Sequence, residues 1–249
     1  MPTLARADGE TLAYTKLEPA ANRPTLVWLS GFKSDMSGGK AIAVKDFAEG
    51  EGLGYLAFDY LGHGESSGDF ADGTISRWRE DCLAAVDELS QGPLLLIGSS
   101  MGGWMSLLTA KARKERIAGM VLIAPAPDFT SKLMWPELSE TARQEISEKG
   151  VWMRPTPYGE PYPLTRRLFE DGAQWSVLDE PIDLSVPVTI LQGKVDPDVP
   201  WTHALKVQDA LDSADVEFVL IKDGEHRLSR DQDIERLLME IKRLVRKIG

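Results

Sequence analysis

Residues 94–102 read Leu-Leu-Leu-Ile-Gly-Ser-Ser-Met-Gly, and this stretch decides the fold. Its four apolar residues are typical of a strand buried on both faces, and the run that starts at Met101 is typical of a helix. Gly-x-Ser-x-Gly at such a strand-to-helix junction predicts a sharp turn that presents the hydroxyl of Ser100 above the sheet. The alternative is that Ser99 or Ser100 only caps the helix, which leaves both glycines and their spacing unexplained.

Strands and helices alternate in both directions from this stretch. Such alternation is typical of a mostly parallel central sheet flanked by helices. The predicted strands are Leu12–Thr15, Thr25–Leu29, Leu53–Phe58, Leu94–Ile97, Met120–Ala124, Val188–Leu191 and Val216–Ile221. The predicted helices span 38–50, 74–90, 101–113, 202–212 and 230–247. We therefore expect a single α/β domain over residues 1–249.

One segment interrupts the alternation. Between Pro125 and Pro181 the chain has eight of its 15 prolines and three of its seven tryptophans, with no convincing strand pattern. We expect two or three short helices there, near Glu137–Lys149 and Leu164–Gln174. Long excursions within a compact domain are usually functional, so residues 126–181 are predicted to form a helical lid, or cap, over a site. The alternative is a surface insertion that only fills a gap.

The composition excludes several classes of function. The chain has 28 Lys and Arg against 39 Asp and Glu, a net charge of −11, which argues against nucleic-acid partners and anionic membrane surfaces. No stretch approaches the length of a membrane span. The lone Cys82 cannot form an intrachain disulfide, and the first residues lack a signal-peptide pattern. We therefore expect a cytoplasmic protein.

A serine nucleophile needs a base, and the chain has three histidines. His226 follows the strand Val216–Ile221 on a loop that leads into the last helix. Reactive groups gather beyond the carboxyl ends of parallel strands, so His226 is the predicted base. His63 lies on a similar loop upstream and is expected to be a hydrogen-bonded loop histidine, whereas His203 lies in the first turn of a helix.

An acid is expected to orient the histidine. Asp196 lies three residues after Gly193, in the loop that follows the strand Val188–Leu191, and is the predicted acid. The alternative is Asp198, which is better placed to cap the helix near Pro200. Ser, Asp and His then occur in the chain order that is typical of α/β-hydrolases.

Attack on a carbonyl creates an oxyanion, which needs backbone N–H donors. The N–H of Met101 follows the nucleophile and lies at the positive end of a helix. The second donor is predicted to be Phe32, in the loop after Thr25–Leu29, where Gly31 permits close approach. An aromatic residue after a strand is more often part of the core than catalytic, so this prediction rests on the position of Phe32 and not on its residue type.

These residues together resemble the α/β-hydrolase fold superfamily over almost the whole chain. The loop Asp59–Ser66 is similar to the Asp-x-x-Gly-x-Gly-x-Ser turn that is common there. Gly31–Met36, Trp78–Asp81 and Gly98–Trp104 resemble the mitochondrial α/β-hydrolase-domain enzymes that act as acyl-glucuronide esterases and palmitoyl-protein thioesterases. This resemblance implies hydrolysis of such esters or long-chain thioesters by Ser100, Asp196 and His226. The chain lacks an Arg- and Ser-rich transit segment, so a mitochondrial location does not carry over.

The predicted substrate is a small-molecule ester or acyl thioester, and no cofactor or metal is expected. The candidate substrate-binding residues come from the oxyanion loop and the lid: Phe32, Trp135, Trp152, Met153 and Arg154. The lid aromatics also include Tyr158 and Tyr162. Arg154, Arg166 or Arg167 are candidates to pair with a substrate carboxylate, although surface solvation also explains them.

Three alternatives remain on the same residues. A peptidase or a carbon–carbon bond hydrolase would share the triad and differ only in the pocket. An inactive binding module would keep the fold without the chemistry. A lipase that acts at an oil–water interface is disfavoured by the many charges of the lid.

Overall fold

The structure, a computed structural model, describes residues 1–156 and 160–248. Within that part of the chain, the central sheet has eight strands in the order β1-β2-β4-β3-β5-β6-β9-β10. The strands are β1 (Thr3–Ala5), β2 (Thr11–Leu17), β3 (Thr25–Leu29), β4 (Gly54–Phe58), β5 (Leu94–Ser99), β6 (Ile117–Ile123), β9 (Val188–Gly193) and β10 (Val216–Ile221). The helices around the sheet are α1 (Gly39–Gly50), α2 (Ile75–Leu89), α3 (Met101–Ala112), α7 (Trp201–Ala210) and α8 (Asp231–Ile248).

The sheet is mostly parallel, as predicted. Strand β2 runs antiparallel to β1 and β4, and all pairings from β4 through β3, β5, β6 and β9 to β10 are parallel. Every predicted strand and every predicted helix outside the insertion is present. The edge strand β1 was not predicted, because three half-exposed residues show no detectable apolar period.

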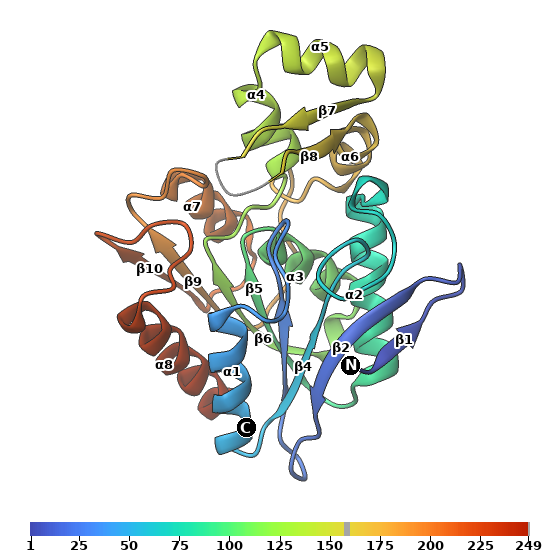
Figure 1. The fold of residues 1–249 in the computed structure, drawn as a ribbon. Helices are drawn as coiled ribbons and strands as arrows, with labels where there is room; N and C mark the ends of the chain where they lie inside the picture. Colours follow the sequence, from blue (N-terminus) through green and yellow to red (C-terminus); the bar gives the residue numbers. More distant parts are fainter. Residues whose placement is uncertain (157–159, 249) are drawn as a thin grey trace.

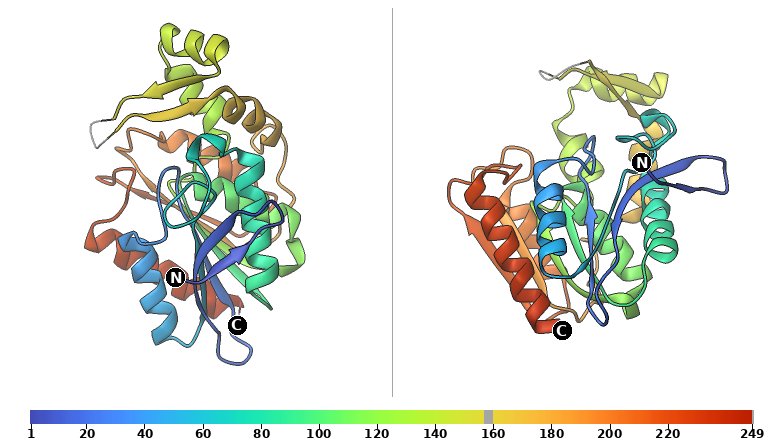
Figure 2. Two further views of the ribbon diagram at one scale, coloured as in Figure 1. Left: turned by 45° about the vertical axis from the view of Figure 1, so that its right-hand side comes forward. Right: turned by 60° about the horizontal axis from the view of Figure 1, so that its bottom comes forward.

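Helices cover both faces of the sheet (Figures 1 and 2). A separate hydrophobic core lies on each face. Side chains of a strand alternate between its faces, so Val27 and Leu29 of β3 pack on the side of α2, α3 and α7, whereas Leu26 and Trp28 pack on the side of α1 and α8. The buried strand β3 therefore has no polar face. Such strands account for the continuous apolar runs of the sequence.

The insertion between β6 and β9 contains a β-hairpin as well as helices. Its elements are the π-helical segment η3 (Thr130–Met134), α4 (Trp135–Glu137), α5 (Glu140–Lys149), β7 (Val151–Arg154), β8 (Tyr162–Thr165), α6 (Arg166–Gly172) and the 3-10 turn η4 (Ala173–Trp175). Strands β7 and β8 pair antiparallel. The expectation of no strand here was wrong. Pro163 hid β8 from a pattern search, yet a two-stranded ribbon has only edges and tolerates a residue without an N–H.

Capping residues set the helix ends within the insertion. The predicted helix Glu137–Lys149 is divided at Ser139, whose Oγ accepts the N–H of Ala142 and starts α5 there. The predicted helix from Leu164 begins instead at Arg166, after Thr165 accepts the N–H of Leu168. The hydroxyl groups of Ser139 and Thr165 therefore determine where these two helices begin, and the spacing of apolar residues does not predict those positions.

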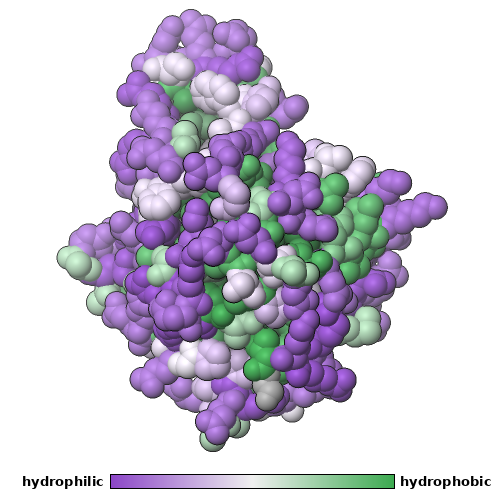
Figure 3. All heavy atoms as spheres, turned by 180° about the vertical axis from the view of Figure 1, so that it is seen from behind, coloured by the Kyte–Doolittle hydropathy of each residue, from purple (hydrophilic) through white to green (hydrophobic). Residues whose placement is uncertain are grey.

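The insertion lies beyond the ends of the strands, and its helix α6 lies next to the start of α2 (Figure 1). There Asp171 of α6 accepts the N–H of Ser76 (2.7 Å). Helix α5 buries Ala142 and Ile146 and exposes Gln144, Glu148 and Lys149. Seen from behind, the outer surface of the insertion is mainly hydrophilic (Figure 3). In the described part of the chain, no helix combines the length and the apolar character that crossing a bilayer requires.

Candidate active site

Ser100 lies at a sharp turn between β5 and α3. Its backbone has φ 56° and ψ −118°, a conformation that non-glycine residues rarely adopt. The N–H of Ser100 donates to the carbonyl of Ile123 at the end of β6 (2.8 Å), and its own carbonyl accepts the N–H groups of Gly103 (2.8 Å) and Ala126 (3.1 Å). Neighbouring elements therefore hold the strained residue in place.

The two glycines of the motif are required because the backbones around the turn touch. A Cβ atom at Gly98 would lie 2.2 Å from the carbonyl oxygen of Gly102. A Cβ atom at Gly102 would lie 1.9 Å from the carbonyl oxygen of Leu29, in β3. Both contacts are far inside van der Waals distance and both involve backbone atoms. The spacing Gly-x-Ser-x-Gly thus reflects how closely α3 packs on β3 and β5.

Ser100, His226 and Asp196 form one chain of hydrogen bonds. His226 Nδ1 lies 2.9 Å from Asp196 Oδ2, and His226 Nε2 lies 3.1 Å from Ser100 Oγ. A carboxylate can only accept, so Nδ1 carries the proton and Nε2 accepts from the Ser100 hydroxyl. The three residues come from the β5–α3 turn, the loop after β9 and the loop between β10 and α8. The structure thus brings together the three residues selected from sequence.

Backbone and side-chain donors hold the Asp196 carboxylate. Oδ1 accepts the N–H groups of Asp198 (2.9 Å) and Val199 (2.8 Å), and Oδ2 accepts Nε2 of Gln192 (3.1 Å) in addition to His226. Burial raises the pKa of Asp196, but the hydrogen bond and charge of His226 and these backbone donors outweigh it and lower the pKa below the usual 3.8. Asp196 is therefore ionised at neutral pH.

Asp198 is not the residue that hydrogen-bonds to His226. Its predicted role as a helix cap was wrong, because the N-cap of α7 is Pro200 and no side chain among residues 1–156 and 160–248 caps that helix. Asp198 supplies its backbone N–H to Asp196, and its side chain lines the cavity beside Ser100. Gln192, the residue before the end of β9, is fully buried beneath Asp196. Sequence reasoning missed Gln192, because a single amide in an apolar strand carries no motif.

The same loop brings together three groups that a cation could use. One ligand atom each from Asp196, Asp198 and His226 lie within 4.8 Å of one another. Both carboxylate oxygens of Asp196 and both ring nitrogens of His226 already have hydrogen-bond partners. A cation there would have to break the contact of His226 with Ser100 or with Asp196, so this group fits a proton-transfer chain better than a metal site.

The predicted oxyanion residues flank Ser100. Met101 is the first residue of α3, where N–H groups have no partner within the helix. Gly31 packs directly on the strand-to-helix turn at Ser100, which we call the elbow. A Cβ atom at Gly31 would lie 3.3 Å from the Ser99 carbonyl oxygen and 3.4 Å from Ser100 Cβ. The turn is closed by the N–H of Ser34, which donates to the Gly31 carbonyl (3.1 Å). The N–H of Phe32 lies within this turn.

A cavity of about 460 Å³ opens beside Ser100 and His226. Most of its lining residues are apolar, and its charged residues, Glu137, Arg154 and Asp198, come from the insertion and from the Asp196 loop. The lining residues are Phe32, Ser100, Met101, Ala126, Phe129, Leu133, Met134, Glu137, Leu138, Arg154, Tyr162, Pro197, Asp198, Val199 and His226. Four apolar residues among these, Phe129, Leu133, Met134 and Leu138, were not singled out from the sequence.

Of the predicted substrate-binding residues, Phe32 and Arg154 line this cavity. Trp135, Trp152 and Met153 are not among its lining residues in the described part of the chain. Trp135 packs on Phe169 with 5.0 Å between ring centroids, Trp152 packs on the core, and the side chain of Met153 is 51% exposed. Met153 lies next to Arg154 in β7 and therefore points to the opposite face of the hairpin, whereas Trp135 belongs to α4 and not to the hairpin. The predicted lid residue Tyr158 lies outside the described residues.

The other two arginines considered for a substrate carboxylate lie on α6. Arg166 donates to the Ser147 carbonyl (3.1 Å), and Arg167 donates to the Asp72 carbonyl (3.1 Å). Both therefore bind protein groups on the surface, outside the lining of the Ser100 cavity.

A second cavity, also of about 460 Å³, shares Phe32, Ser100 and His226 with the first. Its lining includes the charged residues Lys33, Asp35 and Lys40. The other lining residues are Trp28, Gly31, Phe32, Ser34, Gly38, Gly39, Ser99, Ser100, His226, Arg227 and Ser229. Lys40 Nζ donates to Ser99 Oγ (3.1 Å) and to the carbonyl of Arg227. Burial lowers the pKa of Lys40 to about 8. Lys40 thus joins the elbow to the loop that carries His226.

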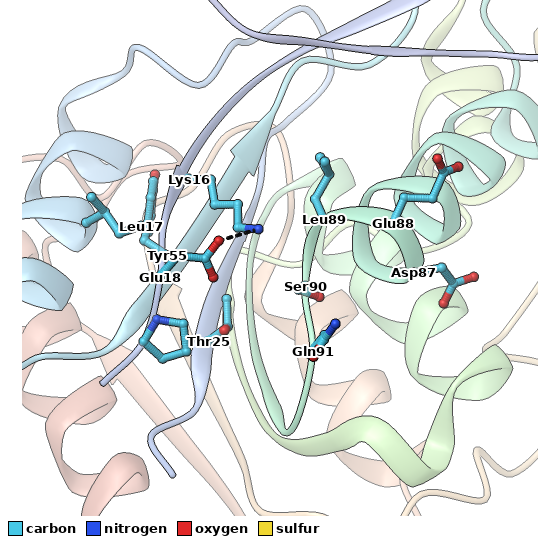
Figure 4. A pocket seen from close by; sticks show the side chains of 11 residues that line it. Lys16, Leu17, Glu18, Thr25, Tyr55, Asp87, Glu88, Leu89, Ser90 and Gln91 are labelled. Atoms are coloured by element: carbon cyan, nitrogen blue, oxygen red, sulfur yellow. Dashed lines mark ion pairs between the residues drawn. The ribbon is translucent and has the colours of Figure 1, made fainter. Parts of the chain in front are cut away.

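A further cavity lies near the opposite ends of the strands (Figure 4). Thr25 starts β3, and Ser90 and Gln91 precede β5, so this cavity of about 350 Å³ is at the amino ends of the parallel strands. Lys16 and Glu18 form an ion pair there (2.6 Å). Ligands of open α/β sheets bind at the carboxyl ends of strands, which favours the cavities at Ser100.

His63 and His203 contact other groups. His63 Nε2 accepts the N–H of Lys33 (3.2 Å), and Nδ1 lies 3.1 Å from the carbonyl of Leu61. His203, in α7, donates from Nε2 to the carbonyl of Pro127 (2.9 Å). The expectation that His63 is a hydrogen-bonded loop histidine agrees with these contacts.

The strand order, the strained serine and the Ser–His–Asp contacts define an α/β-hydrolase. Residues 26–239 match the alpha/beta hydrolase family, and the chain belongs to it. It is 34% identical over 248 residues to the human protein named palmitoyl-protein thioesterase ABHD10, mitochondrial, covering 99% of this chain and 80% of that protein. The predicted resemblance is thereby confirmed.

Two solved structures extend the comparison. Alpha/beta hydrolase domain-containing protein 10 from mouse superposes with a TM-score of 0.90 at 34% identity, covering 100% of this chain and 99% of that one. A crystal structure of a protein from Agrobacterium vitis S4 superposes with a TM-score of 0.93 at 45% identity, covering 98% and 97%. Both likenesses include the insertion, because they cover nearly the whole of each chain.

Proposed function

We propose that this protein is a serine hydrolase that cleaves carboxylic esters or acyl thioesters through an acyl-enzyme intermediate. The observation that carries the proposal is the hydrogen-bond chain from Ser100 through His226 to Asp196, built on a strained elbow. A serine hydroxyl is a poor nucleophile unless a neighbouring base takes its proton.

In the proposed mechanism, Ser100 Oγ bonds to the substrate carbonyl carbon while His226 Nε2 takes the hydroxyl proton. Asp196 stabilises the imidazolium. The tetrahedral intermediate carries an oxyanion, for which the N–H groups of Phe32 and Met101 are the proposed donors. Its collapse breaks the bond to the leaving oxygen or sulfur, which receives the proton from His226. Water, deprotonated by His226, then bonds to the acyl carbon. Collapse of this second intermediate breaks the bond to Ser100 Oγ, which receives the proton back from His226, and releases the carboxylic acid.

The two cavities at Ser100 suggest how the substrate is divided. The cavity lined by Phe129, Leu133 and Leu138 suits an acyl chain, because apolar walls stabilise apolar groups. The polar cavity that contains Lys40 suits the leaving group. The name of the human relative, palmitoyl-protein thioesterase, supports a long acyl chain and a thioester. We therefore propose long-chain acyl thioesters or esters.

Residues 126–181 are proposed to act as a cap over this site within a single 1–249 domain. Leu138 of the insertion and Arg154 of its hairpin line the acyl cavity, which supports such a role. Arg154 is proposed to meet a polar or anionic part of the substrate at the cavity mouth. A cytoplasmic location also remains a proposal that rests on the lone Cys82, while the human relative's name places that protein in mitochondria.

Covalent labelling and a substrate panel test this function. A fluorophosphonate should label Ser100 of the wild type and leave Ser100→Ala unlabelled. Nitrophenyl esters of increasing acyl length, together with one long-chain acyl thioester, should be cleaved, and Ser100→Ala should lower turnover on the order of 10⁶-fold. Cleavage of peptides or carbon–carbon bonds alone would favour those hydrolase classes. A wild type without labelling or turnover would favour an inactive binding module.

A further inference from the structure

Two loops at the carboxyl ends of the strands are joined by hydrogen bonds. One is the β3–α1 loop, which contains Phe32, and the other is the loop after β4, which contains His63. Asp59 Oδ1 accepts the N–H of Met36 (2.8 Å), and His63 Nε2 accepts the N–H of Lys33 (3.2 Å). The second bond therefore holds the residue immediately after the proposed oxyanion donor.

The backbone of this turn needs such support. Lys33 has φ 56°, in the left-handed region that favours glycine. The peptide group between Gly31 and Phe32 is oriented by the Ser34 N–H, which donates to the Gly31 carbonyl. Because a trans peptide is planar, this bond also fixes the direction of the Phe32 N–H. The next peptide group, between Phe32 and Lys33, is held by His63.

His63 has a fixed ring and a fixed tautomer. Its side chain is 4% exposed and packs edge-to-face on Tyr60, Phe70 and Trp78, with ring centroids 5.2–5.6 Å apart. An amide N–H can only donate, so Nε2 is the acceptor and Nδ1 carries the proton toward the Leu61 carbonyl. Burial lowers the pKa of His63 to about 4, which keeps the ring neutral at neutral pH.

We propose that His63 is a positioning residue for the oxyanion hole, because its Nε2 holds the Phe32–Lys33 peptide and so keeps the Phe32 N–H aimed at the reacting carbonyl. This inference rests on the proposed function for its kinetic consequence. His63 touches no reacting atom, so substrate binding is expected to be nearly independent of it. The transition state is affected because its oxyanion needs a donor that is already in place.

Two substitutions separate the hydrogen bond from the packing. His63→Phe keeps an aromatic ring among Tyr60, Phe70 and Trp78 but removes the acceptor. His63→Gln supplies an amide oxygen near the position of Nε2. His63→Phe should lower kcat about 10- to 100-fold, less than the loss of a whole donor, with KM within about twofold. His63→Gln should recover most of that loss.

Affinity for a trifluoromethyl ketone distinguishes loss of the oxyanion donor from a general loss of packing around residue 63. The hemiketal that this inhibitor forms with Ser100 carries an oxyanion, so its inhibition constant should rise with the fall in kcat, whereas KM should not. Equal losses in both variants, or a rise in KM that matches the weaker inhibition, would mean that His63 acts only through packing and would overturn the proposal.

Amide hydrogen exchange tests the bond without relying on turnover. The Lys33 N–H should be protected in the wild type and in His63→Gln, and should exchange faster in His63→Phe. Unchanged protection in His63→Phe refutes the positioning role even if the protein proves to be no hydrolase. Absence of labelling and turnover in the wild type, in contrast, refutes the proposed function. The exchange result then still decides whether His63 holds the Lys33 N–H.

Discussion

The Asp128 carboxylate accepts the backbone N–H of Val177 at 2.9 Å and so joins the start of the insertion to its end, 49 residues later. Asp128 follows β6, and Val177 precedes the return of the chain to β9. The carboxylate also accepts the N–H of Leu178 (3.1 Å) and the hydroxyl of Ser176 (2.7 Å). One fully buried side chain thus holds together the two ends of the insertion, near Asp128 and Val177, which we call its neck.

Replacing Asp128 by Ala should destabilise the protein. The change leaves the buried N–H of Val177 and the part-buried N–H of Leu178 without an acceptor, and a buried group of this kind costs about 1–3 kcal/mol. Asp128 also has φ 55°, which Asn tolerates better than Ala. Urea unfolding should therefore show a loss of roughly 3–5 kcal/mol for Asp128→Ala and a clearly smaller loss for Asp128→Asn. Equal losses would show that the carboxylate bonds do not stabilise the neck.

Replacing Gly102 by Ala should be more damaging than its size suggests. The new methyl group would lie 1.9 Å from the Leu29 carbonyl oxygen, so α3 would have to move away from β3. The free energy of unfolding should fall by about 3 kcal/mol or more. Gly50→Ala is the matched control, because a Cβ atom there meets nothing within 4 Å. A Gly102→Ala protein as stable as the control would contradict the packing described for the elbow.

Replacing Asp196 by Asn should remove most turnover without changing the fold. The amide carries no negative charge and therefore cannot stabilise the imidazolium that forms at His226. We expect kcat to fall about 10⁴-fold. Thermal unfolding should show a folded protein, since Asn keeps the shape and one acceptor for the Val199 N–H. The exposed Asp212 provides a control, and Asp212→Asn should retain wild-type kcat. A small effect of Asp196→Asn would point to a different acid.

Filling the apolar cavity should shorten the preferred acyl chain. Leu138 is 7% exposed and lines the cavity, so Leu138→Trp should lower kcat/KM for long acyl chains about tenfold relative to short ones. Met153→Trp adds similar bulk at a half-exposed position outside the lining and should leave that ratio unchanged. The opposite ranking of the two variants would mean that the acyl chain lies along the hairpin.

Acid should weaken the contribution of His63 to stability. Burial lowers its pKa from 6.5 to about 4; nearby Lys33 acts in the same direction, whereas the Leu61 carbonyl and Asp35 oppose the shift. The folded state then binds fewer protons than the unfolded state, so this contribution is complete above about pH 6.5 and is lost as the pH falls toward 4. The stability difference between wild type and His63→Phe should narrow by about 3 kcal/mol over that window. A constant difference would show that His63 titrates normally.

Features that depend on local chemistry were readable from the sequence. The strand Leu94–Ile97, the glycines beside Ser100 and the start of α3 are neighbours along the chain, so their spacing alone predicts the turn. The apolar runs of β3, β5 and β9 predicted a buried parallel sheet for the same reason. Asp196 and His226 followed because the ends of parallel strands meet at one edge of the sheet.

Features that depend on which surfaces meet were decided by the tertiary structure alone. Packing selected Phe129, Leu133 and Leu138 for the cavity wall and turned Trp135 and Met153 away from it. The contact of His63 with Lys33 spans 30 residues, and that of Asp128 with Val177 spans 49. Such contacts leave no period or motif, because their free energy comes from the exclusion of water and the pairing of buried polar groups once distant segments have come together.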